Sequence, residues 1–186
     1  MPFGLGFFAT AGVSAAAGSF DLLETQVLSS STASVTFSSL NATYGSTYKH
    51  LQIRLAAKDN RGLASSRIYL RINSATTNNI FHNLGGNGTS VYSGVGFTTD
   101  RMIFDYATGA SGNFGAGVID ILDAFQTTKT KVVRGLGGQI AGSYNVVALD
   151  SGAWFDTTTI NTITIGGDFG DLLSGSRFSL YGVKGS

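Results

Sequence analysis

Cysteine is absent from this chain, proline occurs once, and only 12% of the residues are charged. Without cysteine the chain forms no disulfide and no thiolate metal site. The charges nearly cancel, at a formal net charge of +1, so the sequence does not indicate the clustered basic surface that nucleic-acid binding requires. No apolar stretch is long enough to cross a bilayer. We therefore expect neither a nucleic-acid partner nor a membrane partner.

Glycine, by contrast, is abundant, with 26 of 186 residues, and 42% of the residues are hydrophobic. Glycine, serine and threonine disfavour helices, whereas aromatic and β-branched residues favour strands. The high apolar content and the small net charge argue against disorder. This composition predicts one domain built from many short strands and tight turns.

Two segments, residues 48–55 and 66–73, alternate apolar and polar side chains with a period of two. Such alternation is typical of strands in a sheet with one buried face and one solvent-exposed face. The polar loop Lys58–Gly62 between them resembles the turn of a hairpin. We expect this pair to lie at the centre of the sheet. The residues expected to face the core are Leu51, Ile53, Leu55, Ile68, Leu70 and Ile72.

The remaining strands are expected to raise the total to about ten, with the first and last strands adjacent. Residues 74–99 are predicted to be mainly a polar loop region, and the glycine run Gly135–Gly142 is predicted to be a turn. This spacing of short strands predicts an all-β fold, an antiparallel β-sandwich of jelly-roll type, over residues 20–186. The other predicted strands are residues 20–28, 33–40, 101–106, 117–123, 131–134, 145–149, 160–165 and 176–184.

Residues 1–19 form a separate segment that is rich in glycine and alanine. No lysine or arginine occurs before Lys49, so the basic region of a secretory signal is missing. Exposed apolar side chains promote association, so we expect an extended arm that binds a neighbouring subunit. The alternative is a tail folded back on its own domain. The apolar residues expected to make the partner contact are Phe3, Leu5, Phe7, Phe8 and Val13.

Residues that carry catalytic or metal chemistry are sparse. His50 and His82 have no partner at metal-ligand spacing, and no Gly-x-Ser-x-Gly nucleophile motif occurs. Asp168 and Asp171 lie in a glycine loop that offers oxygen ligands for a cation, but turn carboxylates are common without a metal. We therefore expect no enzymatic activity, no cofactor and no metal, and leave the cation at this loop open.

Several tyrosines and the single tryptophan are expected to be exposed. Aromatic rings stack on the apolar faces of sugars, but they are also enriched in protein interfaces and in cores. Tyr92, Tyr144 and Trp154 are accordingly candidates for contact with a glycan or a protein. The others in this group are Tyr44, Tyr48 and Tyr106.

Three segments carry a resemblance to a known group of proteins. They are Gly18–Thr25 (GSFDLLET), Thr47–Arg54 (TYKHLQIR) and Arg177–Gly185 (RFSLYGVKG). The chain from residue 20 to residue 186 resembles small virion structural proteins of tailed bacteriophages, particularly cyanophages and marine phages. These segments are strand sequences without a chemical site, so no functional residue carries over.

The resemblance implies a structural protein located in the virion and made in the cytoplasm of the host bacterium. The first hypothesis is a capsid decoration or cement protein that binds the major coat protein and other virion proteins, itself a homo-oligomer, with a trimer expected. The alternative is a tail-fibre or tail-tip adhesin that binds a glycan on the host surface.

Overall fold

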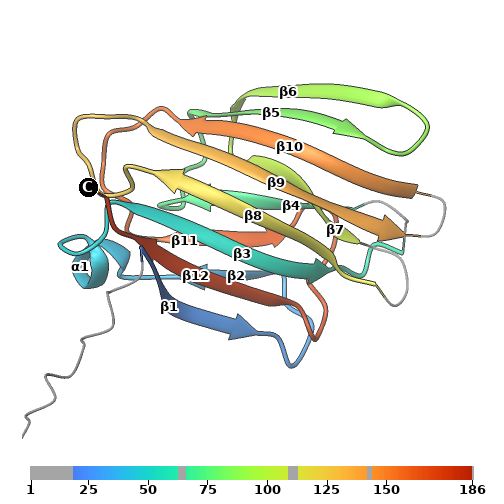
Figure 1. The fold of residues 1–186 in the computed structure, drawn as a ribbon, viewed down its shortest axis with the longest axis horizontal. Helices are drawn as coiled ribbons and strands as arrows, with labels where there is room; N and C mark the ends of the chain where they lie inside the picture. Colours follow the sequence, from blue (N-terminus) through green and yellow to red (C-terminus); the bar gives the residue numbers. More distant parts are fainter. Residues whose placement is uncertain (1–18, 63–65, 109–112, 142–143, 186) are drawn as a thin grey trace, which may run out of the picture.

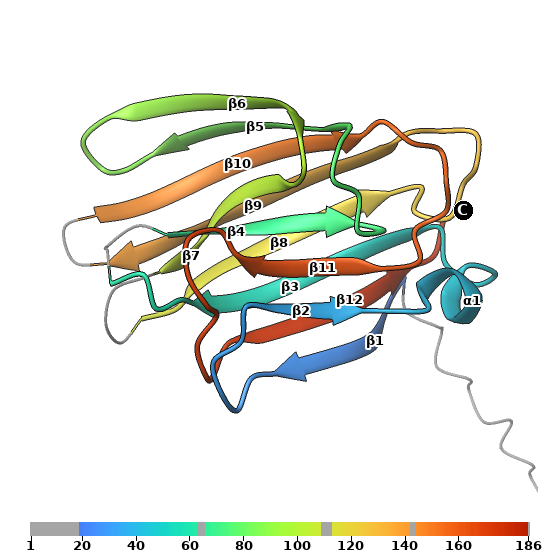
Figure 2. The ribbon, with the colours of Figure 1, turned by 180° about the vertical axis from the view of Figure 1, so that it is seen from behind.

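The computed structural model describes residues 19–62, 66–108, 113–141 and 144–185, which form two packed antiparallel sheets of eight and four strands. Figures 1 and 2 show the two layers from opposite sides. The larger sheet runs in the order β1 (Phe20–Val27), β12 (Arg177–Val183), β3 (His50–Lys58), β8 (Gly115–Leu122), β9 (Lys131–Ala141), β10 (Tyr144–Trp154), β5 (Asn79–Gly86) and β6 (Val91–Thr99). The smaller sheet runs in the order β2 (Ser34–Phe37), β11 (Ile163–Gly167), β4 (Ser66–Ile72) and β7 (Met102–Thr108).

The two sheets are joined at one corner, where β3 and β7 pair in parallel through Ala57 with Ala107 and Lys58 with Thr108. The one helix among the described residues, the short α1 (Leu40–Tyr44), follows β2 and buries Leu40. The predicted β-sandwich is confirmed, and so is the predicted adjacency of the first and last strands, because β1 pairs with β12. The jelly-roll type stays a prediction.

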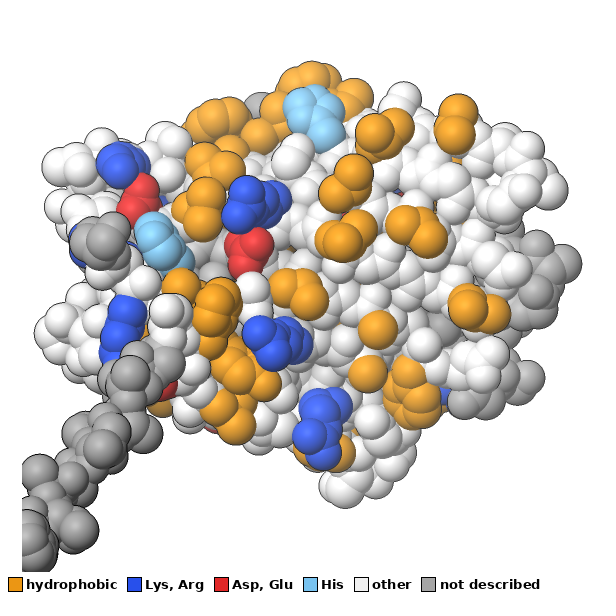
Figure 3. All heavy atoms as spheres, in the orientation of Figure 1, with side chains coloured by type: hydrophobic (Ala, Val, Ile, Leu, Met, Phe, Trp, Pro, Cys, Tyr) orange, Lys and Arg blue, Asp and Glu red, His pale blue; other side chains and the backbone are white. Residues whose placement is uncertain are grey.

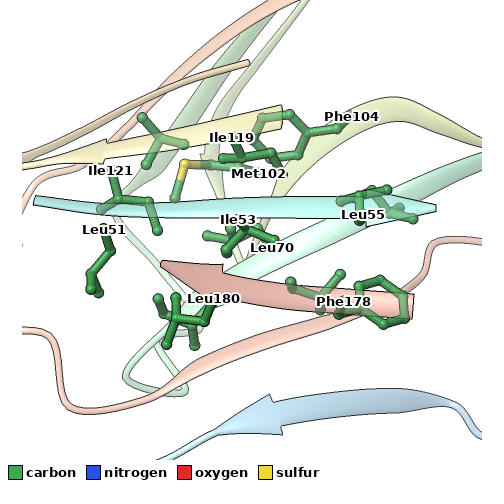
Figure 4. Packing of buried hydrophobic residues seen from close by; sticks show 14 of the residues in the cluster. Leu51, Ile53, Leu55, Leu70, Met102, Phe104, Ile119, Ile121, Phe178 and Leu180 are labelled. Atoms are coloured by element: carbon green, nitrogen blue, oxygen red, sulfur yellow. The ribbon is translucent and has the colours of Figure 1, made fainter. Parts of the chain in front are cut away.

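The core lies between the sheets, as Figure 4 shows. Burial of apolar surface from both layers is the main term that stabilises such a sandwich. The predicted inward faces are confirmed, since each of the six expected residues is at most 6% exposed. Further core residues come from the neighbouring strands: Met102, Phe104, Ile119, Ile121, Phe178 and Leu180.

The expected central hairpin is wrong. β3 and β4 lie in different sheets and face each other across the core. Both edges of β3 are occupied, since it pairs with β12 on one side and β8 on the other. β4 pairs instead with β11 and β7. The polar residues after Lys58 therefore connect two layers and do not close a two-stranded turn.

Two segments predicted to lack strands contain them, so the described part of the chain has twelve strands where about ten were expected. Residues 79–99 form the hairpin of β5 and β6, and the glycine run at 135–141 is the second half of β9. Glycine and asparagine are depleted in strands, so propensity alone argues against both elements. Tertiary packing overrides that preference.

The packing that compensates is the stacking of aromatic rings over glycines. A Cβ atom added to Gly85 would lie 2.4 Å from the Tyr92 ring, and one added to Gly96 would lie 2.3 Å from the Phe81 ring. Each ring covers the glycine directly opposite on the paired strand, a known means of stabilising glycine in sheets. Tyr69 over Gly166 repeats the arrangement, and Tyr48, which precedes β3, also covers Gly182. Several of the glycines thus lie in strands because an aromatic ring covers each of them.

The largest such contact is made by Tyr106 on β7, which is fully buried. Its ring occupies the space that side chains would take at Gly117 on β8 and at Gly135 and Gly137 on β9. These glycines let β7 approach the larger sheet closely.

The predicted arm at residues 1–19 lies almost entirely outside the described residues. Its expected contact residues Phe3, Leu5, Phe7, Phe8 and Val13 all lie outside them.

Candidate functional site

The outer face of the eight-stranded sheet carries a row of exposed apolar side chains. Val118 on β8 lies opposite Leu136 on β9, Leu136 lies opposite Leu149 on β10, and Leu149 lies opposite Leu84 on β5. The three leucines are each 55–56% exposed. Neighbouring strands lie about 4.8 Å apart, so the row spans roughly 15 Å. We call these four residues the apolar row.

More apolar side chains extend this surface. Val147 is 67% exposed and Val91 is 86% exposed, and both pair with Gly86 in the next register position along the sheet. Ile140, near the end of β9, is 67% exposed. Figure 3 shows the hydrophobic side chains spread over this face with few charged ones among them. Contiguous apolar surface of this kind marks interaction sites in soluble proteins.

One side of the apolar row is bordered by polar residues. Arg134 lies opposite Asp120, with its Nε 3.3 Å from the carboxylate, and Gln52 donates to the same carboxylate at 2.8 Å. His82 and Ser151 continue this border on β5 and β10. An apolar centre with a polar border is the usual composition of a protein interface.

The face is also hollowed at two places. One hollow of about 450 Å³ lies along the apolar row, between Val118, Leu136 and Leu149. A second hollow, of about 620 Å³, lies at Gly137 and Gly138 of β9, which have no side chains to fill it. Phe114 and Val147 lie beside it. A partner surface can therefore insert side chains into the hollows and receive the protruding apolar side chains in its own.

Beneath this face lies a buried polar cluster of Asp150, Asn83 and Tyr106. Asp150 is 4% exposed, and its carboxylate accepts a hydrogen bond from the Asn83 side chain. Burial raises the pKa of Asp150 to about 6, although the contacts with Tyr106 and Asn83 act in the opposite direction. Burial likewise raises the pKa of the Tyr106 hydroxyl, which therefore stays protonated.

This cluster predicts a specific pH dependence of stability. Because the pKa of Asp150 rises on folding, the folded protein binds the proton more tightly, and stability falls as the pH rises from about 4 to about 6. The penalty at neutral pH is roughly 3 kcal/mol. The free energy of unfolding of Asp150→Asn, relative to that of the native protein, is therefore expected to increase by about that much as the pH rises from about 4 to about 7.5. Urea unfolding measures both proteins at each pH. Asp171→Asn, on an exposed loop, is the control; an equal gain there contradicts the assignment.

The predicted aromatic surface is largely not formed. Trp154 is 5% exposed and Tyr106 is fully buried, so the expectation that both are exposed is wrong. Both lie on strands whose inward positions fill the core. Tyr92 is partly buried and donates a hydrogen bond to Asp105 at 2.8 Å. The side chain of Tyr144 lies outside the described part of the structure.

The remaining candidate residues make structural contacts. Asp168 pairs with Arg67 at 2.7 Å, which neutralises one carboxylate of the proposed cation loop, and Asp171 is exposed. His50 accepts a hydrogen bond from the backbone N–H of Asp123, and His82 packs edge-on against Phe97. Within the described residues, no group of three or more His, Cys, Asp or Glu side chains is placed to hold a metal ion.

The apolar row itself was not predicted from the sequence. The signal for it is that residues 146–149 are apolar on both faces of a strand: Val146 and Ala148 face the core while Val147 and Leu149 face outward. A strand buried on both faces has this pattern. Here one of the two faces has no covering layer in the described structure.

No helix among the described residues has the length and apolar character needed to span a membrane. A scan against protein-family models, a search of curated proteins and a search of solved structures each found no match to this chain.

Proposed function

We propose that the protein is a structural component of a tailed-phage virion that decorates the outside of the coat-protein shell and stabilises contacts between capsomers. The observation that supports this proposal best is the apolar row on the outer face of the larger sheet. A partner that covers this row removes the apolar surface of Val118, Leu136, Leu149 and Leu84 from water.

Repetition of the same contact over a shell makes weak binding at each copy sufficient. Many identical copies on one particle bind with weak individual affinity, because neighbouring contacts raise the effective concentration. The sparse charge of the chain, 12% of residues, limits the desolvation penalty when the face is covered. In this proposal the arm at residues 1–19 reaches a neighbouring subunit, the protein is a trimer, and its role is structural and not enzymatic.

A tail-fibre adhesin is the alternative proposal. It relies on exposed aromatic residues for stacking on a glycan, and the burial of Trp154 removes the largest of them. The exposed phenylalanines on strands of this sheet, Phe20 on β1 and Phe97 on β6, lie at its two opposite edges. The decoration role is therefore favoured.

The test is the copy number of the chain relative to the major coat protein in purified particles, measured by quantitative mass spectrometry. We expect a ratio close to stoichiometric, with the protein released by mild denaturant before the shell disassembles. A handful of copies per particle indicates a tail or vertex component. Complete absence from the particle contradicts both proposals.

A further inference from the structure

A separate pocket of about 340 Å³ lies away from the outer face, between the smaller sheet and the inner side of the larger one. Its volume is at the lower end of the range for small-molecule sites. It is lined by residues from five strands, from the segment that follows β3 and from the loop before β12. The lining residues are Arg61, Arg67, Tyr92, Asp105, Gln139, Val146 and Phe169.

Two buried polar atoms in this lining have no hydrogen-bond partner in the protein. One is the acceptor Oε1 of Gln139, a residue that is 4% exposed, and the other is the donor Nε of Arg67. A buried polar atom without a partner destabilises the fold, so most native proteins satisfy such atoms. One acceptor and one donor at a single pocket match a ligand that both donates and accepts.

The charges of the lining favour a neutral ligand. The Arg67 guanidinium is already paired with Asp168 at 2.7 Å through its Nη2. Asp105 accepts a hydrogen bond from Tyr92 at 2.8 Å, and its carboxylate lies at the same opening. Arg61 adds a second guanidinium, whose carbon lies 3.8 Å from the Phe169 ring. The two guanidinium groups of Arg61 and Arg67 and the two carboxylates of Asp105 and Asp168 cancel, so the site favours neither an anion nor a cation.

The rest of the lining is apolar. Val146 lies on the β10 side, and the Phe169 ring lies 4.7 Å from the Arg67 guanidinium carbon, which holds that guanidinium against the ring. A ligand that fits has hydroxyl groups at its edge and a C–H surface for Val146. This combination is characteristic of a sugar ring.

We propose that this pocket binds a single neutral sugar unit. One hydroxyl oxygen of the sugar accepts a hydrogen bond from Nε of Arg67, and another hydroxyl donates to Oε1 of Gln139. A third hydroxyl donates to the carboxylate of Asp105. This site is independent of the apolar row, and its existence does not require the protein to be a capsid component.

The proposal is tested by saturation-transfer NMR and calorimetry with glucose, galactose, mannose and N-acetylglucosamine, and with glucuronate as the anionic comparison. We expect saturable binding of at least one neutral sugar and weaker binding of glucuronate. Gln139→Met, which keeps the volume but removes the acceptor, is expected to weaken the binding at least tenfold. The control is Gln26→Met on β1, which leaves binding unchanged.

Folding of the variant is checked separately. Gln139→Met removes an unpaired buried acceptor, so its thermal midpoint is expected to equal or exceed that of the native protein. Arg67→Lys keeps the charge next to Asp168 but lacks Nε, and it provides a second variant with the same expected loss of binding. The proposal is overturned if none of the four neutral sugars saturates the protein, or if both variants bind as tightly as the native protein.

Discussion

Replacing Gly135 with alanine is expected to destabilise the protein markedly, and the same replacement is expected to cost much less when Tyr106 is changed to phenylalanine. A Cβ atom at Gly135 would lie 2.3 Å from the Tyr106 hydroxyl oxygen, while the next atoms, including the ring carbon that bears the hydroxyl, are 3.2 Å away. Overpacking of a buried site costs about 1–3 kcal/mol. Removing the hydroxyl removes the one severe overlap.

Gly117 provides the matched comparison on the neighbouring strand. A Cβ atom there would meet three ring carbons of Tyr106, the closest at 2.3 Å, and the hydroxyl is not among them. Gly117→Ala should therefore cost the same free energy of unfolding in the native protein and in Tyr106→Phe. Gly94→Ala on β6, whose nearest neighbouring atom is 3.8 Å away, should change stability by no more than about 0.5 kcal/mol.

Urea unfolding of the four proteins in each double-mutant cycle measures the coupling directly. We expect a coupling of about 1 kcal/mol or more between Gly135 and Tyr106, and none between Gly117 and the hydroxyl. Equal costs for Gly135→Ala in both backgrounds would show that the Tyr106 hydroxyl does not occupy this position. The result also tests why a glycine run forms a strand here.

Leu136→Glu is expected to weaken attachment of the protein to the particle strongly while leaving its fold intact. Leu136 lies within the apolar row and is 55% exposed, so a polar side chain at this position changes stability little. In a covered interface the same carboxylate is buried without a partner. Central interface residues contribute 2 kcal/mol or more, so binding should weaken by at least about 30-fold.

The measurement is co-sedimentation of the purified protein with particles assembled without it. Val27→Glu is the matched control: Val27 is 53% exposed on the edge strand β1, three strands away from Val118. We expect Val27→Glu to bind like the native protein. If Leu136→Glu binds normally and Val27→Glu does not, the contact lies at the β1 edge and the assignment of the apolar row is wrong.

The sequence by itself determined the fold class and the facing of individual strands. Side-chain alternation is a local property of the extended backbone, so Leu51, Ile53, Ile68 and Leu70 were correctly assigned to the core from their spacing. The shortage of helix-favouring patterns correctly indicated an all-β protein. These conclusions depend on neighbours in the chain, which the sequence displays.

Only the tertiary structure decided which strands pair, because pairing depends on residues far apart in the chain. β3 and β4 have hairpin-like sequences, yet β12 and β8 occupy the edges of β3. The glycines of β9 predict a turn, and the packing of the Tyr106 side chain from β7 against them explains why they form a strand. Trp154 carries no local sign of its burial.

The candidate interface shows the same division. Val118, Leu136, Leu149 and Leu84 lie on four strands separated by up to 65 positions between Leu84 and Leu149, and only the register of three strand pairs aligns them. Each residue alone is an ordinary exposed apolar side chain, of a kind found on most protein surfaces. Their alignment into one surface is a property of the folded sheet.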